Sequence, residues 1–393
     1  MNCALARNIP VMLGTPAQSL IQNPNTKEVI GVQAVDWKGA TINVQANKAV
    51  ILACGGHENN PEMTNNFLPW GHSQGPFVTF WGSPYLTGDG IVMAQSVGAK
   101  LWHMNNKEWA HGEYGCLAAC QEFGMGFTVT ATSSASIMVN RYGQRFMNEH
   151  TGSGHTAQIF PIDTLVENNA LNAGYTTSYN PQFNYLPTDY VDYPNYPFYL
   201  IFDSSLMKAG PLHSGGWPGL VSLLHPAGTQ TYTWSNDNSV ELAKGWIQEG
   251  PDPATLGNSV ICYDFFGRVV GMNGANLLAT INQWNTDCTA GKGDTVWGRE
   301  AAAMAPLISP PYYAMQLVVG SLNTNGGPVH DQYGRTIDVY NNPIPRLYSI
   351  GELGSIFGFL YHSGGNFPEA MTMGRIAGAH AAKLPSLAVN PGS

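Results

Sequence analysis

The sequence predicts an α/β protein in which residues 1–72 and 311–393 form one domain, with an α+β domain, residues 73–310, inserted between them. Near both ends of the chain, apolar strands, turn signals and helices alternate, and one apolar strand in each end segment stops on glycine. Between about residues 73 and 310 this alternation is lost, and aromatic residues, Asn and Gly become dense. These two observations predict the two-domain arrangement.

The first end segment contains a hairpin pattern followed by a buried strand. Val29–Val32 and Thr41–Val44 alternate apolar and polar residues on either side of a Lys38-Gly39 turn, which predicts a β-hairpin. The strand Ala49–Cys54 is continuously apolar, as expected of a buried strand, and it ends on Gly55-Gly56.

The inserted and last segments carry weaker but definite signals. We expect a hairpin over Ser136–Phe146, a buried strand at Phe198–Asp203 and an amphipathic helix around Asn276–Trp284, where apolar residues recur at helical spacing. In the last segment we expect a strand at Arg346–Ile350 and a closing helix at Pro368–Ala382.

Composition narrows the class of function. The chain has 393 residues, of which 44% are hydrophobic, so ordinary buried cores are expected and disorder is not. Its net charge is -9, so we expect neither nucleic acid nor an anionic membrane surface as a partner. No apolar run approaches the roughly 18 residues needed to span a bilayer. No targeting segment is recognised in this chain, and the localisation stays open.

The cysteines do not predict a metal site. The six cysteines form no CxxC pair and no Cys/His spacing typical of zinc. Cys116 and Cys120 are four residues apart, and two small buried thiols are favoured there over a redox pair.

Three segments could hold a ligand. Cys54–Gly56 and Gly351–Glu352 each follow a buried strand, where glycine lets a flat ligand approach the backbone and an acid can accept hydrogen bonds from ligand hydroxyls. Ordinary turns and a surface glutamate remain alternatives for each. The third segment, Tyr361–Asn366, runs into the last helix, whose N-terminus favours an electron-rich ligand atom.

The order of these motifs resembles that of a known family. Ala49–Gly56, Ser136–Glu149, Asn323–Gly327, Ile344–Glu352 and Gly364–Gly378 together resemble soluble fumarate reductases, urocanate reductase and 3-ketosteroid dehydrogenases. The resemblance implies FAD bound between a Rossmann-like domain and an inserted capping domain. It also implies hydride transfer at a carbon-carbon bond next to an electron-withdrawing group.

The resemblance also implies roles for individual residues. Arg145 and Glu149 are expected to form a structural ion pair rather than a catalytic one. The residues expected to line FAD are Cys54, Gly55, Gly56, Gly351, Glu352, Gly364, Gly365, Asn366 and Phe367.

One departure from the family concerns the phosphate-binding loop. Family members open with a strand, a GxGxxG turn and a helix, and no GxGxxG occurs in this sequence. We therefore expect that a partner chain supplies the N-terminal FAD-binding segment, or that the segment has been lost by truncation.

A second departure concerns the substrate. Fumarate reductases clamp a dicarboxylate with arginines and histidines, and three of these cationic anchors are replaced here, one of them by Asn323. A neutral, carbonyl-containing substrate is therefore expected. Tyr361, paired with the backbone N-H of Gly365, could polarise a ketone as in ketosteroid dehydrogenases, and His362 and His155 are the other proton-donor candidates. Plain packing of Tyr361 and ordinary roles for both histidines remain alternatives.

The sequence thus favours an FAD-dependent oxidoreductase that reduces or desaturates a C-C bond beside a carbonyl. Two alternatives stay open at this point. One is a non-catalytic or half-site subunit of a flavoprotein complex, and the other is a dicarboxylate reductase of the fumarate reductase kind.

Overall fold

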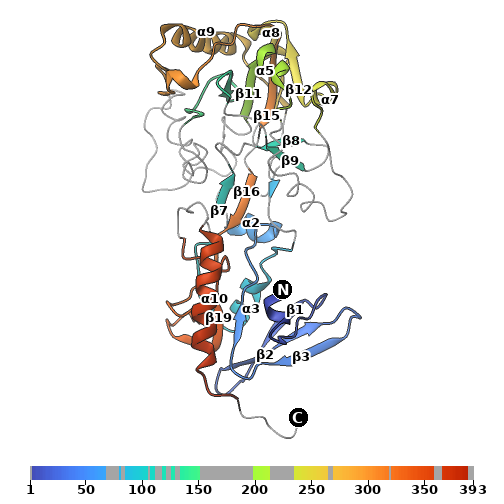
Figure 1. Ribbon diagram of the computed structural model, residues 1–393, viewed down its shortest axis with the longest axis vertical. Coiled ribbons are helices and arrows are strands. Elements are labelled where there is room, and N and C mark those ends of the chain that lie inside the picture. The colour runs from blue at the N-terminus through green and yellow to red at the C-terminus, as the bar shows by residue number, and fades with distance from the viewer. Residues whose placement is uncertain are drawn as a thin grey trace.

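The described chain forms two lobes stacked along the long axis of the molecule (Figure 1). The computed structural model describes residues 2–67, 79–80, 85–104, 107–110, 117–120, 125–128, 133–150, 198–212, 234–263, 269–317, 320–357 and 365–387. The lower lobe contains the first and last described helices, α1 (Asn2–Leu5) and α10 (Asn366–Ala382). The upper lobe contains α9 (Gly274–Ala290).

The lower lobe begins with a three-stranded antiparallel sheet. Its strands are β1 (Ala17–Gln22), β2 (Val29–Val35) and β3 (Thr41–Gln45), in that order. The expected hairpin is confirmed, because β2 and β3 pair antiparallel around a turn in which Gly39 takes a φ of 85°. The Asp36 carboxylate accepts hydrogen bonds from two backbone N-H groups of this turn.

The second sheet of the lower lobe carries the two glycine-ended strands. β4 (Val50–Leu52) and β19 (Pro343–Ser349) run parallel, and β18 (Arg335–Ile337) adds antiparallel to the other edge of β19. Ile51 lies opposite Tyr348 in the register. The carboxyl ends of β4 and β19 therefore lie side by side, although their residues are far apart in the sequence.

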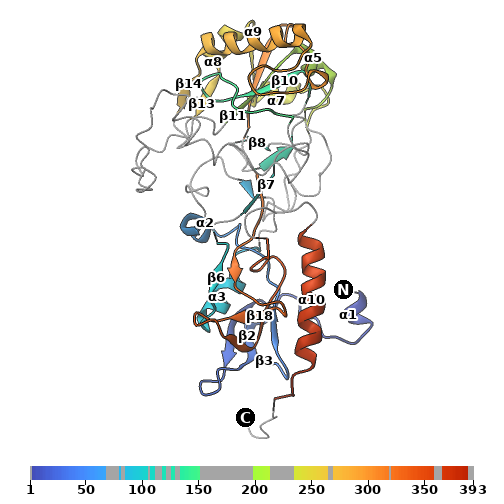
Figure 2. The same cartoon turned by 90° about the vertical axis from the view of Figure 1, so that its left-hand side faces the viewer.

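Helices cover this sheet from both sides, and Figure 2 shows α10 on one side of the lower lobe and α3 (Asp89–Ser96) on the other. On the α10 side, Tyr348 packs with Met373 and Ala377. On the opposite side, β4, β19, α3 and the first sheet share one core, made of Leu20, Val29, Val50, Leu52, Ile91, Met93, Ala94, Ala99, Ile344, Leu347 and Leu353. The closing helix is confirmed, and it begins at Asn366 rather than Pro368.

The position of α3 bears on the domain boundaries. The boundary expected after residue 72 assigns α3 to the inserted domain, but α3 packs in the core of the lower lobe. The boundaries themselves stay predictions.

The upper lobe is built on a four-stranded antiparallel sheet of order β10-β11-β15-β12. Its strands are β10 (Ser136–Val139), β11 (Phe198–Asp203), β15 (Tyr312–Leu317) and β12 (Ile247–Gly250). Every residue of β11 is buried, because the strand is flanked by β10 and β15. The expected strand at Phe198–Asp203 is confirmed.

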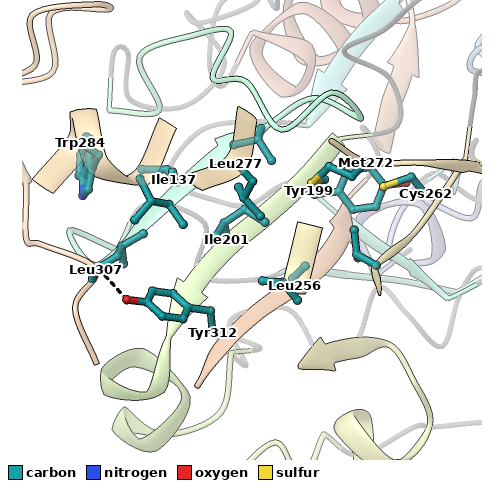
Figure 3. Packing of buried hydrophobic residues seen from close by; sticks show 14 residues of the cluster. Ile137, Tyr199, Ile201, Leu256, Cys262, Met272, Leu277, Trp284, Leu307 and Tyr312 are labelled. Atoms are coloured by element: carbon teal, nitrogen blue, oxygen red, sulfur yellow. Dashed lines mark hydrogen bonds between the residues drawn. The ribbon is translucent and has the colours of Figure 1, made fainter. Parts of the chain in front are cut away.

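Two helices pack against this sheet. α8 (Pro253–Ser259) and α9 begin at side-chain caps from Asp252 and Asn273, which accept backbone hydrogen bonds from the first turn of each helix. Figure 3 shows Ile137, Ile201 and Leu256 meeting Leu277 and Trp284 of α9 in one apolar cluster. The helix expected around Asn276–Trp284 is confirmed, within a longer element.

The expected hairpin over Ser136–Phe146 forms only in part. A turn follows β10, but the returning chain makes a single bridge, between Val139 and Arg145. β10 pairs along its length with β11 instead. The buried β11 offers a complete row of backbone partners, whereas the segment after the turn carries Arg145 and Glu149 into an ion-pair network.

This network, which we call the arginine network, is the main buried charge cluster of the upper lobe. Arg145 contacts Glu149 and Asp294 at 2.7 Å each, and Arg299 contacts Glu149 at 3.3 Å. Both guanidinium groups lie over the Trp284 ring, at 4.8 and 5.1 Å from its centroid. The expected Arg145–Glu149 pair is confirmed as a buried ion pair.

The other elements are short. They are α2 (Pro61–Phe67), β5 (Thr79–Phe80), β6 (Leu101–Trp102), β7 (Lys107–Ala110), β8 (Leu117–Cys120), β9 (Met125–Thr128), α5 (Ser204–Ala209), α7 (Ser239–Ala243), β13 (Ile261–Tyr263), β14 (Val269–Gly271), a 3-10 turn (Ala301–Ala303), β16 (Gly320–Thr324) and β17 (Gly327–Pro328). Within the described ranges, no helix has the length and apolar character of a membrane span.

Candidate cofactor site

The predicted cofactor-binding residues of the lower lobe gather at the carboxyl ends of β4 and β19. Cys54, Gly55 and Gly56 follow β4, and Gly351 and Glu352 follow β19, so the parallel pairing places them at one edge of the sheet. This is the edge at which open α/β sheets bind ligands.

The two glycines after β4 are enclosed by side chains. Gly55 has a φ of 75°, a conformation that favours glycine, and a Cβ there would contact Leu86. A Cβ on Gly56 would contact the Thr324 hydroxyl and the Glu58 carboxylate. Side chains of this chain therefore lie close to the backbone of both Gly55 and Gly56.

Two acidic side chains, Glu58 and Glu352, flank Gly56, and we call them the acid pair. Glu58 is fully buried, at 0% exposure, and its Oε2 accepts a hydrogen bond of 3.1 Å from the Thr324 hydroxyl. Its Oε1 is buried and has no hydrogen-bond partner among the described residues. Glu352 is half-buried and accepts a hydrogen bond from the Gly56 N-H.

The surroundings make both carboxyls weaker acids. Burial and, after it, the charge of Glu352 raise the pKa of Glu58 to about 8, against smaller lowering effects of backbone N-H groups and the Thr324 hydroxyl. Burial also raises the pKa of Glu352, to about 7, with Glu369 acting in the same direction. At neutral pH the acid pair therefore retains a proton.

The first turn of α10 forms another wall of the site. Gly351 lies against it, since a Cβ there would be 3.6 Å from the Ala370 side chain. Glu369 accepts hydrogen bonds from the Ser355 hydroxyl, at 2.8 Å, and the Ile356 N-H, at 2.7 Å, and burial raises its pKa. Among the described residues, no side chain caps this helix N-terminus. The positive end of a helix favours an electron-rich atom.

An aromatic group backs the loop after Glu352. Trp102 donates a hydrogen bond of 3.1 Å to the Gly354 carbonyl and stacks on His103 at 4.5 Å. His103 in turn contacts the Ser355 carbonyl through its Nδ1, at 2.9 Å. His330 meets the edge of Trp102 at 5.2 Å. These contacts fix the backbone that precedes residues 358–364.

Not every residue predicted to bind the cofactor or to be catalytic is placed beside the acid pair. Gly365 and Asn366 lie at the start of α10, and Phe367 is 73% exposed. Gly364 and the three candidate catalytic residues, Tyr361, His362 and His155, lie outside the described residues. Their roles stay predictions.

Sequence reasoning missed three parts of this site. Glu58 stands two positions after Gly56, and an acid so close to a glycine-ended strand could have been noticed. The turn Gly88–Gly90 was also missed: a Cβ on Gly90 would lie 3.0 Å from the Cys54 side chain. Thr324 offered no local signal, because its contact with Glu58 spans 266 positions.

The residues present fit the hydroxyl-bearing and ring parts of FAD. Carboxylates such as Glu352 accept hydrogen bonds from sugar-like hydroxyls, and glycine at positions 55 and 56 adds no further side chain to this edge of the sheet. The unpaired Oε1 of Glu58 calls for a proton or for a polar group outside the described residues. The sequence has no GxGxxG loop for the pyrophosphate.

Comparisons with known proteins agree with this interpretation. The chain is 26% identical over 400 residues to the digoxin reductase of Eggerthella lenta, covering 96% of this chain and 60% of that protein. It is 25% identical over 339 residues to a probable fumarate reductase of Shewanella frigidimarina, covering 86% and 44%. The solved structure of the 3-ketosteroid Δ1-dehydrogenase of Sterolibacterium denitrificans has a TM-score of 0.69 at 24% identity, covering 96% and 61%. That structural likeness shows a shared mixed α/β fold.

The chain spans about half the length of the curated relatives it matches. A family model described as an FAD binding domain matches residues 1–367. The resemblance expected from the motifs is thereby confirmed, with FAD as the cofactor of the family. The chain belongs to the FAD binding domain family of flavoproteins.

Proposed function

We propose that this protein is part of an FAD-dependent oxidoreductase that reduces or desaturates a C-C bond beside the carbonyl of a neutral substrate. In this proposal the lower lobe is a partial Rossmann-like FAD-binding domain and the upper lobe belongs to an inserted capping domain. The observation that carries the substrate class is the charge of the site, which is acidic and amide-lined.

The amides stand beside the acid pair. Asn323 and Asn325, on either side of Thr324, are 5% and 1% exposed, and the Asn323 amide donates to Asn325 at 3.1 Å. Amides can bind an uncharged carbonyl or hydroxyl, but they supply no positive charge. With Glu58, Glu352 and Glu369 nearby, a desolvated dicarboxylate would be repelled.

Four arginines of the described residues pair with acids elsewhere. Arg145 and Arg299 belong to the arginine network of the upper lobe. Arg335 pairs with Asp331 and Arg346 with Glu28. No arginine is among the groups that shift the pKa of the acid pair. This distribution favours a neutral substrate over fumarate.

The chemistry divides between the cofactor and the chain. FAD, when bound, supplies the hydride-exchanging group of the reaction. Gly55, Gly56 and Glu352 would hold it at the sheet edge, and the N-terminus of α10 would stabilise negative charge on its ring. Tyr361, His362 or His155 would polarise the substrate carbonyl or carry the proton.

The test is the reoxidation of reduced, FAD-loaded protein by two kinds of acceptor. After anaerobic chemical reduction, the protein is mixed with a neutral cyclic enone or with fumarate, and the return of flavin absorbance is followed. We expect the enone to reoxidise the flavin at least about tenfold faster than fumarate, since this difference corresponds to about 1.4 kcal/mol in the barrier. Comparable rates with fumarate would favour the dicarboxylate reductase instead.

A second candidate function is a half-site subunit that needs a partner chain for a complete FAD site. The observation that favours it is the edge position of β4, which pairs only with β19 among the described strands and leaves Ile51 37% exposed. The measurement is the flavin absorbance retained after the chain is mixed with FAD and desalted. Loss of all flavin, restored by a partner carrying a GxGxxG segment, would support this candidate.

A further inference from the structure

Glu58 is a buried acid to which the proposed chemistry assigns no role. It stands in the loop after β4 at 0% exposure, a position that an ionised carboxylate occupies only when charges or hydrogen bonds compensate it. Its Oε2 has the Thr324 hydroxyl as a donor, and its Oε1 has no partner among the described residues. Half of this carboxyl is therefore uncompensated.

The Thr324 hydroxyl does not compensate the other oxygen. Its hydroxyl has one hydrogen to donate, which goes to Glu58 Oε2, and it accepts a hydrogen bond of 2.9 Å from the His57 N-H. The threonine thus fixes the rotamer of Glu58 without neutralising its charge. The remaining oxygen of Glu58 therefore needs a proton of its own or a partner outside the described residues.

Glu352 is the nearest acid on the other side of Gly56. A Cβ on Gly56 would contact Glu58 Oε2 and would be 3.5 Å from Glu352 Cδ, so both carboxyls lie around one point. The distance from Glu58 Oε2 to Glu352 Cδ is therefore no more than about 6 Å, and two buried carboxylates that close together do not both ionise. The Gly56 N-H donates to Glu352 and holds it in this position.

Other titratable groups surround the acid pair without cancelling its charge. His57 lies in the same loop, Asp89 lies at the start of α3, and Glu369 on α10 raises the pKa of Glu352. Behind Glu369 stand His103 and His330, whose charges lower the pKa of Glu369. Among the described residues, no cation lowers the pKa of Glu58 or Glu352.

We propose that Glu58 and Glu352 share one proton. Glu58 is then a positioning residue, because it holds the Glu352 carboxylate where this can accept a hydrogen bond from a cofactor hydroxyl. The inference rests on the proposed FAD site. The proton held by one carboxyl is donated to the other, which leaves a Glu352 oxygen to accept a hydrogen bond from the hydroxyl. At higher pH the proton passes to solvent, two carboxylates remain, and their repulsion displaces Glu352.

The first test uses the protein without FAD and measures its unfolding by urea from pH 5 to pH 9. Because folding raises the pKa of the acid pair, the stabilisation is complete below the ordinary value of 4.5 and is lost as pH rises through about 7 to 8. We expect the free energy of unfolding of the wild type to fall over this pH range. Any pH dependence that all variants share is subtracted first. Glu58→Gln keeps a neutral donor beside Glu352 and should reduce that fall to the part that the burial of Glu352 causes by itself.

Two further variants keep this test decisive. Glu352→Gln neutralises the partner and should also make the fall shallower, leaving the part that the burial of Glu58 causes; this variant replaces Glu58→Gln if the latter does not fold. Glu241→Gln is the matched control: Glu241 is a fully buried acid of the upper lobe that accepts hydrogen bonds from Ser235, and this variant should keep the wild-type profile. A wild-type slope that persists in both Glu58→Gln and Glu352→Gln would overturn the proposal.

The second test measures FAD affinity by flavin fluorescence at each pH. In the wild type the dissociation constant should rise by up to about tenfold per pH unit above the pKa of the pair, as expected when binding needs one proton. Glu58→Gln should bind FAD with little pH dependence, and Glu58→Ala should bind more weakly at every pH. Wild-type affinity in Glu58→Ala would contradict the positioning role.

The two tests separate the two proposals. If no variant binds FAD at any pH, the proposed FAD site fails for this chain, while the unfolding profiles still decide whether the proton is shared. If FAD binds but the profiles of wild type and Glu58→Gln coincide, the shared proton fails and the proposed function stands.

Discussion

The two lobes bury charge in opposite ways. In the upper lobe, the arginine network places Arg145 and Arg299 against Glu149 and Asp294, with the Trp284 ring beneath both guanidinium groups. In the lower lobe, Glu58, Glu352 and Glu369 lie near one another without an arginine among the described residues that contacts them. One cluster is compensated by charge and the other only by protons and hydrogen bonds.

This difference separates a structural cluster from a functional one. A compensated buried network fixes one arrangement of the chain and costs a large free energy when one partner is removed. Uncompensated acids have shifted pKa values, and such groups gather where a ligand or a reaction needs them. The contrast therefore supports the proposal that the upper-lobe network is structural and that the acid pair binds a ligand.

The largest effect is expected from Glu149→Ala, which would break the compensated cluster. Both arginines would lose a buried partner, and the backbone N-H of Met138 would lose its acceptor. We expect a loss of about 3–5 kcal/mol in the free energy of unfolding, the usual range for a broken buried ion pair. Urea denaturation checks it, and a loss below about 1 kcal/mol would mean that the network contributes little.

A smaller effect is expected from Gly56→Ala in the uncompensated cluster. The new methyl group would contact the Thr324 hydroxyl and Glu58, at a cost of about 1–3 kcal/mol for overpacking, and would weaken FAD binding. Unfolding and flavin fluorescence measure the two consequences. The matched control is Gly378→Ala in α10, where a Cβ meets nothing within 4 Å. This variant should be stabilised by about 0.5–1 kcal/mol and should keep its FAD affinity.

The smallest effect is expected from Asp331→Asn, which removes an exposed ion pair. Arg335 contacts Asp331 at 2.6 Å with its side chain 37% exposed, so water screens the pair. We expect a change of no more than about 1 kcal/mol in the free energy of unfolding. A cost comparable to that of Glu149→Ala would show that burial does not distinguish these ion pairs.

Several elements could be predicted from the sequence because their causes are local. The turn at Gly39, the apolar run of β11 and the helical spacing in α9 are each contained in a short stretch of chain. The same holds for the two strands that end on glycine, and it made the candidate ligand-binding edge of the lower lobe recognisable. The partial hairpin after Ser136 is the exception, because the segment after its turn carries Arg145 and Glu149 into the arginine network.

By itself, the sequence determined the family, the cofactor and the regular elements, because periodicity, turn residues and motif order are properties of neighbouring residues. Only the tertiary structure decided that α3 packs in the lower lobe, that Arg299 joins Arg145, and that Thr324 meets Glu58. These contacts join segments far apart in the chain. Charge compensation depends on which side chains share a buried volume, and spacing along the chain does not specify that.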